Sequence, residues 1–199
     1  EIYFASGKTK ESIKLLPQRE AYVEKDEDVL FLRDDIDEFT LRVRQDYDKK
    51  PFKNIESASA NDLSKEEKDK LETAKREHKR FLDTLSESLK GKVDEVSFSS
   101  KLVSSPVCLS TKEGLSRNRE RVLDGQAKRE GEEENAPKSV KVLEINPESD
   151  LFKARSKLDD DKVKEYGSVL YDEARLISGF EIDDKEDFLK KLNSLRVLA

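Results

Sequence analysis

Residues that commonly build metal, redox and catalytic sites are scarce in this sequence. Its 199 residues include one cysteine, one histidine, no methionine and no tryptophan. Cys108 alone cannot form an intramolecular disulfide or a cysteine-rich zinc site. His78 alone argues against a histidine-based metal site or a catalytic triad. We expect Cys108, in an apolar run, and His78, on an apolar helical face, to be packed side chains.

Long apolar runs and an excess of basic residues are also absent. Every apolar run is far shorter than the ~20 residues that a membrane helix needs. Lysine and arginine total 39 against 45 aspartates and glutamates, which gives a formal net charge of −6. A dedicated nucleic-acid protein needs a basic surface that displaces counterions from phosphates. We therefore expect a soluble, cytoplasmic interaction protein with neither nucleic acid nor membrane as a partner.

Residues 1–57 alternate strand-like and helix-like segments, which predicts a small parallel α/β subdomain. Short apolar runs predict strands at 2–5 and 29–32, and we expect a third strand at 52–55. Three helices are also predicted. Thr9 caps the first, at 9–16, and Pro17 opens the second, at 17–25. The third begins after Asp34 or Asp35, which caps it. The first strand begins directly after Glu1 with no initiator methionine, so we expect a piece of a longer protein.

Residues 58–91 combine a polar joint with one long amphipathic helix. Ser64 and Glu67 form the Ser-x-x-Glu capping box at its start. Apolar residues recur at helical spacing over 65–90, and Gly91 ends the helix. We interpret this segment as a linker and connector helix between two modules.

Residues 92–199 predict a three-stranded sheet with helices, so the chain as a whole combines α/β and α+β architecture. The strands are expected at 93–98, 107–109 and 140–145. A highly polar stretch at 126–138 is expected to form a mobile loop. Three helices follow, from about 149, at 162–178 and at 185–198, and the last two are separated by Gly179.

The last two helices carry wide apolar stripes. The first stripe consists of Val163, Tyr166, Leu170 and Ile177, with Val169 and Leu176 beside it, and the second of Phe188, Leu189, Leu192, Leu195 and Leu198. A symmetric partner would complete a four-helix bundle, and each buried leucine or phenylalanine would add roughly 1.5–3 kcal/mol. Alternatively, both helices cover the sheet of their own module. The pattern alone does not choose between these two arrangements.

Two features imitate catalytic or ligand sites. The turn Ser6-Gly7-Lys8-Thr9 follows a strand and opens a helix, like a phosphate-binding loop, but Ile2 stands where that loop has its first glycine. A tight turn with a helix cap is the favoured interpretation, and a small nucleotide-binding α/β enzyme is the rival.

The second feature is a set of acidic clusters at helix starts, where carboxylates complement the helix dipole. There are three such clusters: Asp34, Asp35, Asp37 and Glu38; Asp159, Asp160 and Asp161; and Asp183 and Asp184.

A short helix at 114–123 is a candidate for partner binding. Leu115, Val122 and Leu123 form a small apolar face beside the polar stretch. Such a face either binds a partner or packs on the sheet of its own module, and the sequence favours neither.

Five motifs in register resemble the heat shock protein 90 family of molecular chaperones, in its bacterial HtpG type. They are residues 2–12 with Leu16-Pro17-Gln18, Val29-Leu30 with Asp35-Ile36-Asp37-Glu38-Phe39, Ser105-Pro106-Val107-Cys108-Leu109, Leu143-Glu144-Ile145-Asn146-Pro147, and Leu170-Tyr171-Asp172-Glu173-Ala174 followed by Gly179. They extend over almost the whole chain. The resemblance implies the end of the middle domain in residues 1–57, a connector in 58–91 and the C-terminal dimerisation domain in 92–199.

The resemblance also implies a function. This family is an ATP-driven chaperone whose ATP and magnesium bind in an N-terminal domain, which lies outside this chain. The chain itself is then expected to hold no cofactor or metal, to have no catalytic residue and to be no enzyme. Its partners would be a second copy of itself and unfolded or partly folded client proteins. Clients would bind at Leu115, Val122, Leu123, Glu38 and Phe39, and the dimer would form through Val169, Leu170, Ile177, Phe188, Leu192 and Leu195.

Five arginines depart from the family pattern. Arg19, Arg117, Arg119, Arg175 and Arg196 stand where the family commonly has an apolar residue, often methionine. An unpaired guanidinium buried at Arg175 in the dimer helix would cost several kcal/mol. Because the chain also lacks methionine altogether, we hypothesise that methionines were replaced at these positions, and the intact mass of the protein tests this.

Overall fold

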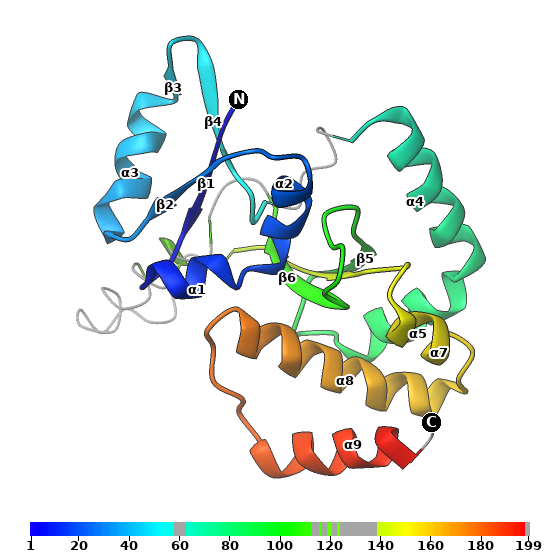
Figure 1. Cartoon of the computed structure of the whole chain (residues 1–199). Helices are drawn as coiled ribbons and strands as arrows, with labels where there is room; N and C mark the ends of the chain where they lie inside the picture. The colour runs from blue at the N-terminus through cyan, green and yellow to red at the C-terminus, as the bar shows by residue number, and fades with distance from the viewer. Residues whose placement is uncertain (58–62, 113–115, 117–118, 121–122, 124–138, 198–199) are drawn as a thin grey trace.

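The computed structural model describes residues 1–57, 63–112, 116, 119–120, 123 and 139–197. Within them the chain forms two sheets, each with its own buried apolar cluster, and the two lie side by side (Figure 1). No helix in the described ranges combines the length and the apolar character that crossing a membrane requires. The division into 1–57, 58–91 and 92–199 as separate domains stays a prediction.

The first sheet has the strand order β2-β1-β4-β3. Its strands are β1 (Ile2–Ser6), β2 (Val29–Leu32), β3 (Asp46–Tyr47) and β4 (Lys50–Asn54). β1 pairs in parallel with both β2 and β4, whereas β3 pairs antiparallel with β4, so the unit is α/β as predicted but its sheet is mixed and not purely parallel. The accompanying helices are α1 (Lys10–Lys14), the 3-10 helix η1 (Pro17–Arg19), α2 (Glu20–Glu24) and α3 (Asp35–Arg44). Ile13 and Ile55 are fully buried in this cluster.

The antiparallel hairpin of β3 and β4 was not expected from the sequence. Asp48 and Lys49 form its two-residue turn, and both have positive φ, at 50° and 63°. Positive φ at both central residues is the geometry of a tight hairpin turn, which usually selects asparagine and glycine. The sequence has neither residue here, so the usual hairpin signal is missing.

The expected connector helix is two helices. α4 (Lys65–Glu77) and α5 (Lys79–Ser88) meet at His78, whose backbone leaves the helical region. α5 buries Phe81 and Leu85, whereas α4 buries no residue fully and contacts the core only through the partly buried Leu71 and Ala74. The His78 ring packs edge-on against Phe152, with 4.8 Å between ring centroids, which confirms the prediction of a packed histidine.

The second sheet has the strand order β5-β7-β6. β5 (Glu95–Phe98) runs parallel to β7 (Lys141–Ile145), and β6 (Val107–Thr111) runs antiparallel to β7. α7 (Asp150–Arg155), α8 (Asp160–Ile177) and α9 (Lys185–Val197) follow. α8 packs against β6 and α5, and α9 packs mainly against α8 (Figure 1). All five residues of β6 are buried, including Cys108 as predicted.

Hydrogen bonds from α2 and η1 join the first half of the chain to the second. The carboxylate of Glu20 accepts hydrogen bonds from the backbone N–H groups of Val103, Ser104 and Ser105, at 2.7–3.2 Å, and from both serine hydroxyls. Gln18 Nε2 donates to the carbonyl of Leu109 at 2.8 Å. Burial opposes ionisation of Glu20, but the bonds from Ser105, Val103 and Ser104 outweigh it and hold its pKa below the usual 4.5.

A glycine allows the closest helix approach in the second core. α5 and α8 cross at Gly167, where an added Cβ would lie 2.4 Å from Cδ2 of Leu85. Leu85 is fully buried, so it has little room to move away. A side chain at this position would therefore force the two helices apart.

We predict that Gly167→Ala lowers the free energy of unfolding by about 1–3 kcal/mol, because overpacking outweighs the better helix propensity of alanine. Urea unfolding followed by circular dichroism measures the change. In a Leu85→Ala background the same substitution should cost less, since the clashing methyl group is absent. An equal cost in both backgrounds would contradict this crossing geometry.

We predict that Glu20→Gln lowers the free energy of unfolding at neutral pH by about 1–2 kcal/mol, a modest figure because the carboxylate is largely hydrated. The lowered pKa means that the contribution of Glu20 is complete above pH 4.5 and is lost as the pH falls further, through the folded-state pKa. Thermal unfolding of both proteins across this range measures the difference. Glu24→Gln, an exposed change on the same helix, is the control and should show no such dependence.

Candidate functional site

The turn that imitates a phosphate-binding loop is a helix cap. The hydroxyl of Thr9 accepts a hydrogen bond from the backbone N–H of Ser12 at 3.0 Å, and the hydroxyl of Ser12 donates to the carbonyl of Thr9 at 2.8 Å. The N–H of Gly7 donates to the carbonyl of Leu32 at 3.1 Å. The hydroxyl of Ser6 donates to Glu38. These donors serve the fold, so the turn does not fit the phosphates of a nucleotide.

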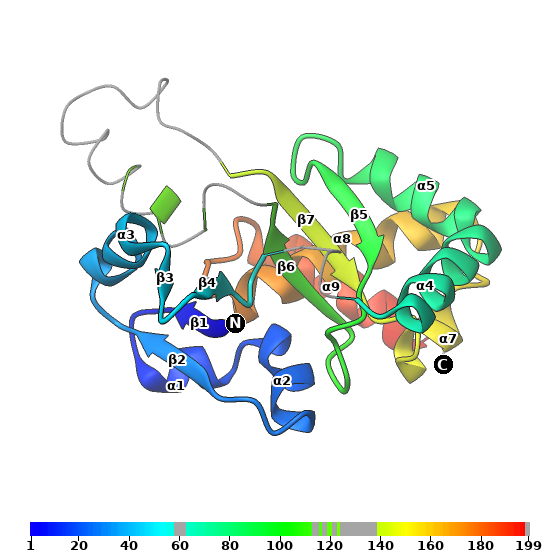
Figure 2. The same cartoon turned by 90° about the horizontal axis from the view of Figure 1, so that it is seen from above.

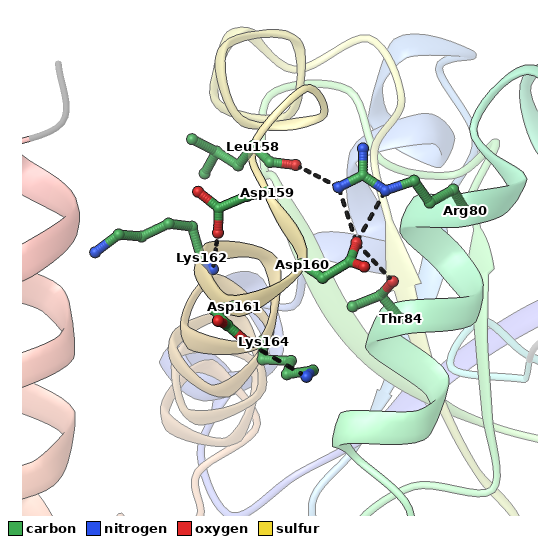
Figure 3. Close-up of polar contacts among 8 residues, drawn as sticks. All are labelled: Arg80, Thr84, Leu158, Asp159, Asp160, Asp161, Lys162 and Lys164. Carbon is green, nitrogen blue, oxygen red and sulfur yellow. Dashed lines mark hydrogen bonds and ion pairs between the residues drawn. The ribbon is translucent and has the colours of Figure 1, made fainter.

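The acidic run Asp159, Asp160 and Asp161 is divided among three separate contacts (Figure 3). Asp159 caps α8 by accepting from the N–H of Lys162 at 3.0 Å. Asp160 accepts from Nε of Arg80 at 2.9 Å, and this bond lowers the pKa of Asp160. Arg80 also donates to the carbonyl of Leu158 at 2.8 Å, which ties α5 to the start of α8. Among the described residues, no cluster of metal-ligating side chains exists.

The acidic residues at the start of α3 differ in exposure. The backbone N–H of Asp34 donates to Oδ2 of Asp37 at 3.2 Å, which is a capping contact. Glu38, a predicted client-binding residue, is only 6% exposed and accepts a hydrogen bond from Ser6 at 3.1 Å. Its carboxylate is therefore committed to the fold, and the half-buried Phe39 is the more accessible neighbour.

The structure brings the two predicted client-binding areas together. The guanidinium of Arg119 lies 5.1 Å from the centroid of the Phe39 ring, and the described pieces of the segment around it lie next to α3 (Figure 2). Leu123 is helical and half-buried, whereas Leu115 and Val122 lie outside the described residues. Phe39 of α3 and Arg119 of the predicted helix at 114–123 thus belong to one region, a proximity that the sequence did not indicate.

A cavity of about 440 Å³ opens beside this region, between the two sheets. Glu38, Leu41 and Arg42 of α3 line one wall at helical spacing, together with Gln45, which caps the C-terminus of α3, and with Phe4 and Phe52 of the first sheet. Lys101, Lys112 and Arg119 line the cavity from the second half of the chain. These residues are far apart in the sequence, so no local motif could have revealed the cavity.

The predicted dimer residues divide into three groups. Val169, Leu170 and Leu195 are at most 6% exposed, because they pack in the core beneath α8 and α9. Phe188 and Leu192 are half-buried against that core. Only Ile177 is exposed. The alternative that these helices cover their own sheet therefore applies to α8, and the buried residues offer little surface to a partner.

Exposed apolar side chains nevertheless remain on the last two helices. Leu176 and Ile177 stand at the end of α8, and Leu189 and Val197 on α9 are 53% and 85% exposed. Leu176 and Leu189 belonged to the stripes seen in the sequence, but the set of candidate interface residues omitted them. Their exposure depends on how α8 lies on the sheet, which the stripe pattern does not determine.

The free-energy cost of an unpaired guanidinium does not arise at Arg175, because this side chain is paired with Asp183. It forms a two-bonded ion pair with Asp183, with Nη2 2.9 Å from Oδ1, and it lies 5.7 Å from the ring centroid of Tyr171. The bond from Arg175 lowers the pKa of Asp183. Arg19 likewise lies over the ring of Phe31 at 5.7 Å. Arg117 lies outside the described residues.

Comparison with known proteins places this geometry in a family. The family model described as "Hsp90 protein" matches residues 1–198. Curated relatives named "Chaperone protein HtpG" include those of Clostridium acetobutylicum, 40% identical over 197 residues, Fusobacterium nucleatum, 36% over 199, and Shouchella clausii, 34% over 199. Each match covers 98% of this chain but only 30–32% of the relative, so the chain spans under a third of these proteins. The chain belongs to the Hsp90 family.

Proposed function

We propose that this chain is the dimer-forming and client-binding part of a cytoplasmic chaperone of the HtpG type. The observation that carries the proposal is the family match, which runs from residue 1 to residue 198. In the proposal, ATP and magnesium bind outside this chain, and the chain itself is not an enzyme. The Ser6–Thr9 turn supports that division, because its polar groups already serve a helix cap and the contact with Glu38.

The homodimer is proposed to form through the outer surface of α8 and α9. Leu176, Ile177, Leu189 and Val197 are exposed there. α9 packs mainly against α8 and has no second layer on its far side in the described structure (Figure 1). A second copy related by a two-fold axis would remove these side chains from water and extend the helix pair into a bundle.

Client binding is proposed at Phe39, which Arg119 contacts, and at Leu123, which lies four residues after Arg119 in the chain. An aromatic ring that is partly exposed, and that has a guanidinium on one face, offers both apolar contact and polar contact to an unfolded chain. Unfolded clients expose apolar side chains, so a mixed surface of this kind suits many sequences. Leu115 and Val122 stay predicted members of the same surface.

We predict that Leu189→Asp weakens the homodimer about a hundredfold or more, because each of the two protomers loses a buried leucine and gains a charge. Sedimentation equilibrium at micromolar concentration measures the mass against 22.9 kDa for the single chain. Leu15→Asp is the control, since Leu15 is 73% exposed on the other half of the molecule. A Leu189→Asp protein that keeps the wild-type dimer mass would exclude this interface.

We predict that Phe39→Ser raises the chain concentration needed to suppress client aggregation by about fivefold, from the loss of roughly 1 kcal/mol of aromatic contact. Light scattering of a thermally unfolding client measures the suppression. Tyr47→Ser is a matched control, because Tyr47 is also an aromatic residue beneath an arginine, with Arg44 5.2 Å from its ring centroid. Equal losses in both variants would count against a specific surface at Phe39.

A further inference from the structure

The last two helices form an antiparallel pair with a defined register. α8 and α9 pack against each other and run in opposite directions (Figure 1). The Nζ of Lys191 donates to the hydroxyl of Ser168 at 3.2 Å, and the hydroxyl of Ser194 donates to the carboxylate of Glu165 at 3.2 Å. Each step toward the end of α9 is therefore a step toward the start of α8.

Glu173 and Arg196 stand at opposite ends of this helix pair. The register places Arg196 level with Val163, so Glu173 lies about 15 Å further along α8 at a rise of 1.5 Å per residue. Glu173 is half-buried, and Arg196 is exposed. Within the described ranges neither side chain forms an ion pair, and Arg196 donates its one hydrogen bond to the neutral amide of Asn193, at 3.3 Å.

The surroundings of Glu173 disfavour its charge. Burial raises the pKa of Glu173, and no cation among the described residues offsets this effect. Other charged side chains near it on the two helices have partners in the same chain: Arg175 with Asp183, Lys190 with Glu186, and Lys191 with Asp187. A carboxylate partly removed from water is unfavourable without a counter-ion. Glu173 therefore gains from a cation that another molecule supplies.

Both side chains lie on faces that also expose apolar residues. Glu173 precedes Leu176 and Ile177 by three and four residues, so the three share one face of α8. Arg196 follows Leu189 by seven residues, so these two share one face of α9. Leu176, Ile177 and Leu189 belong to the surface proposed above for the dimer. One carboxylate and one guanidinium therefore border that surface, at its two ends.

We infer that Glu173 of one protomer pairs with Arg196 of the other and that this pair sets the alignment of two copies of the chain, an inference that rests on the dimer proposed above. A two-fold axis perpendicular to the helix pair reverses its direction. The end of α8 in one copy then meets the end of α9 in the other, and symmetry forms the ion pair twice. An axis parallel to the helices would bring like ends together and leave all four charges unpaired.

The occupant of the surface follows from its self-complementarity. A second copy supplies a guanidinium for Glu173 and a carboxylate for Arg196 at the same time. An unfolded client has no fixed spacing of charges, so it does not satisfy both groups together. Opposite charges across an interface chiefly fix its register and exclude wrong partners, while the apolar residues supply most of the affinity.

Charge reversal tests the pair by complementation. Glu173→Arg places arginines opposite each other in a homodimer, and Arg196→Glu places glutamates opposite each other. Each variant alone should dimerise about thirtyfold more weakly than the wild-type chain, because two ion pairs become two repulsions. In an equimolar mixture both contacts again join opposite charges, so the heterodimer should return to within about fivefold of the wild-type affinity. Sedimentation equilibrium measures these masses against 22.9 kDa for one chain.

Lys164→Glu is the matched control for Arg196→Glu. Lys164 is exposed on α8, and its position nine residues before Glu173 puts it on the opposite face of that helix. The charge change is the same, and the dimer affinity should stay unchanged. Circular dichroism checks the fold of each variant. The milder changes Glu173→Gln and Arg196→Gln complete a double-mutant cycle, in which both together should weaken the dimer no more than either alone.

Three results would overturn the inference. They are a mixture that dimerises no better than its components, a charge-reversed variant that dimerises as tightly as the wild-type chain, and an equal loss of affinity in Lys164→Glu. If the wild-type chain is a dimer, any of these defeats the ion pair alone. A wild-type chain that stays monomeric would leave the surface to another partner and defeat the proposed dimer as well.

Discussion

The second sheet has to be covered on both faces, and most of the structure follows from this constraint. β6 presents five buried residues in succession. α8 covers one face, and the first half of the chain meets the free edge of β6, where Gln18 donates to the carbonyl of Leu109 and the N–H of Thr111 donates to the carbonyl of Glu56. Backbone carbonyls and hydroxyls at such a joint need partners, because an unsatisfied buried polar group costs about 1–3 kcal/mol. Gln18, Glu20 and Lys101 supply those partners. The cavity lies at the edge of the same joint, where the two halves do not fill the space between them.

Local signals in the sequence predicted much of the fold. Thr9, Ser64 and Asp159 cap helices as their residue types suggest, and Gly91 and Gly179 adopt positive φ. Every strand of the two sheets except β3 was expected from the sequence, although β4 and β5 contain charged and polar residues. That strand depends on a turn whose two residues, Asp48 and Lys49, adopt left-handed backbone without glycine. The break at His78 also escaped prediction, since it follows from how α5 docks and not from a helix-breaking residue.

Candidate sites were harder to predict than elements, because sites depend on which side of a helix meets the core. The stripe of α8 was correctly identified as apolar, yet the pattern could not tell that Val169 and Leu170 face the sheet of their own chain.

The surroundings of charged side chains were equally hard to predict from the sequence. Arg19, Arg119 and Arg175 looked misplaced in an apolar environment, but each lies over an aromatic ring, at 5.1–5.7 Å. A flat guanidinium can pack on a ring while its edge stays polar, so the positions tolerate arginine. Whether methionine once stood there stays a hypothesis.

The two proposed surfaces differ in chemistry and in place. The outer side of α9 exposes apolar residues, whereas the surface at Phe39 combines an aromatic ring with the guanidinium of Arg119. α9 and α3 lie at opposite ends of the molecule (Figure 1). A dimer formed through α9 would therefore leave the Phe39 surface of each protomer accessible. Two weak sites on one dimer can hold a single unfolded polypeptide more tightly than either site alone, because the second contact is intramolecular. On this argument, dimerisation would strengthen client binding without any change in the Phe39 surface itself.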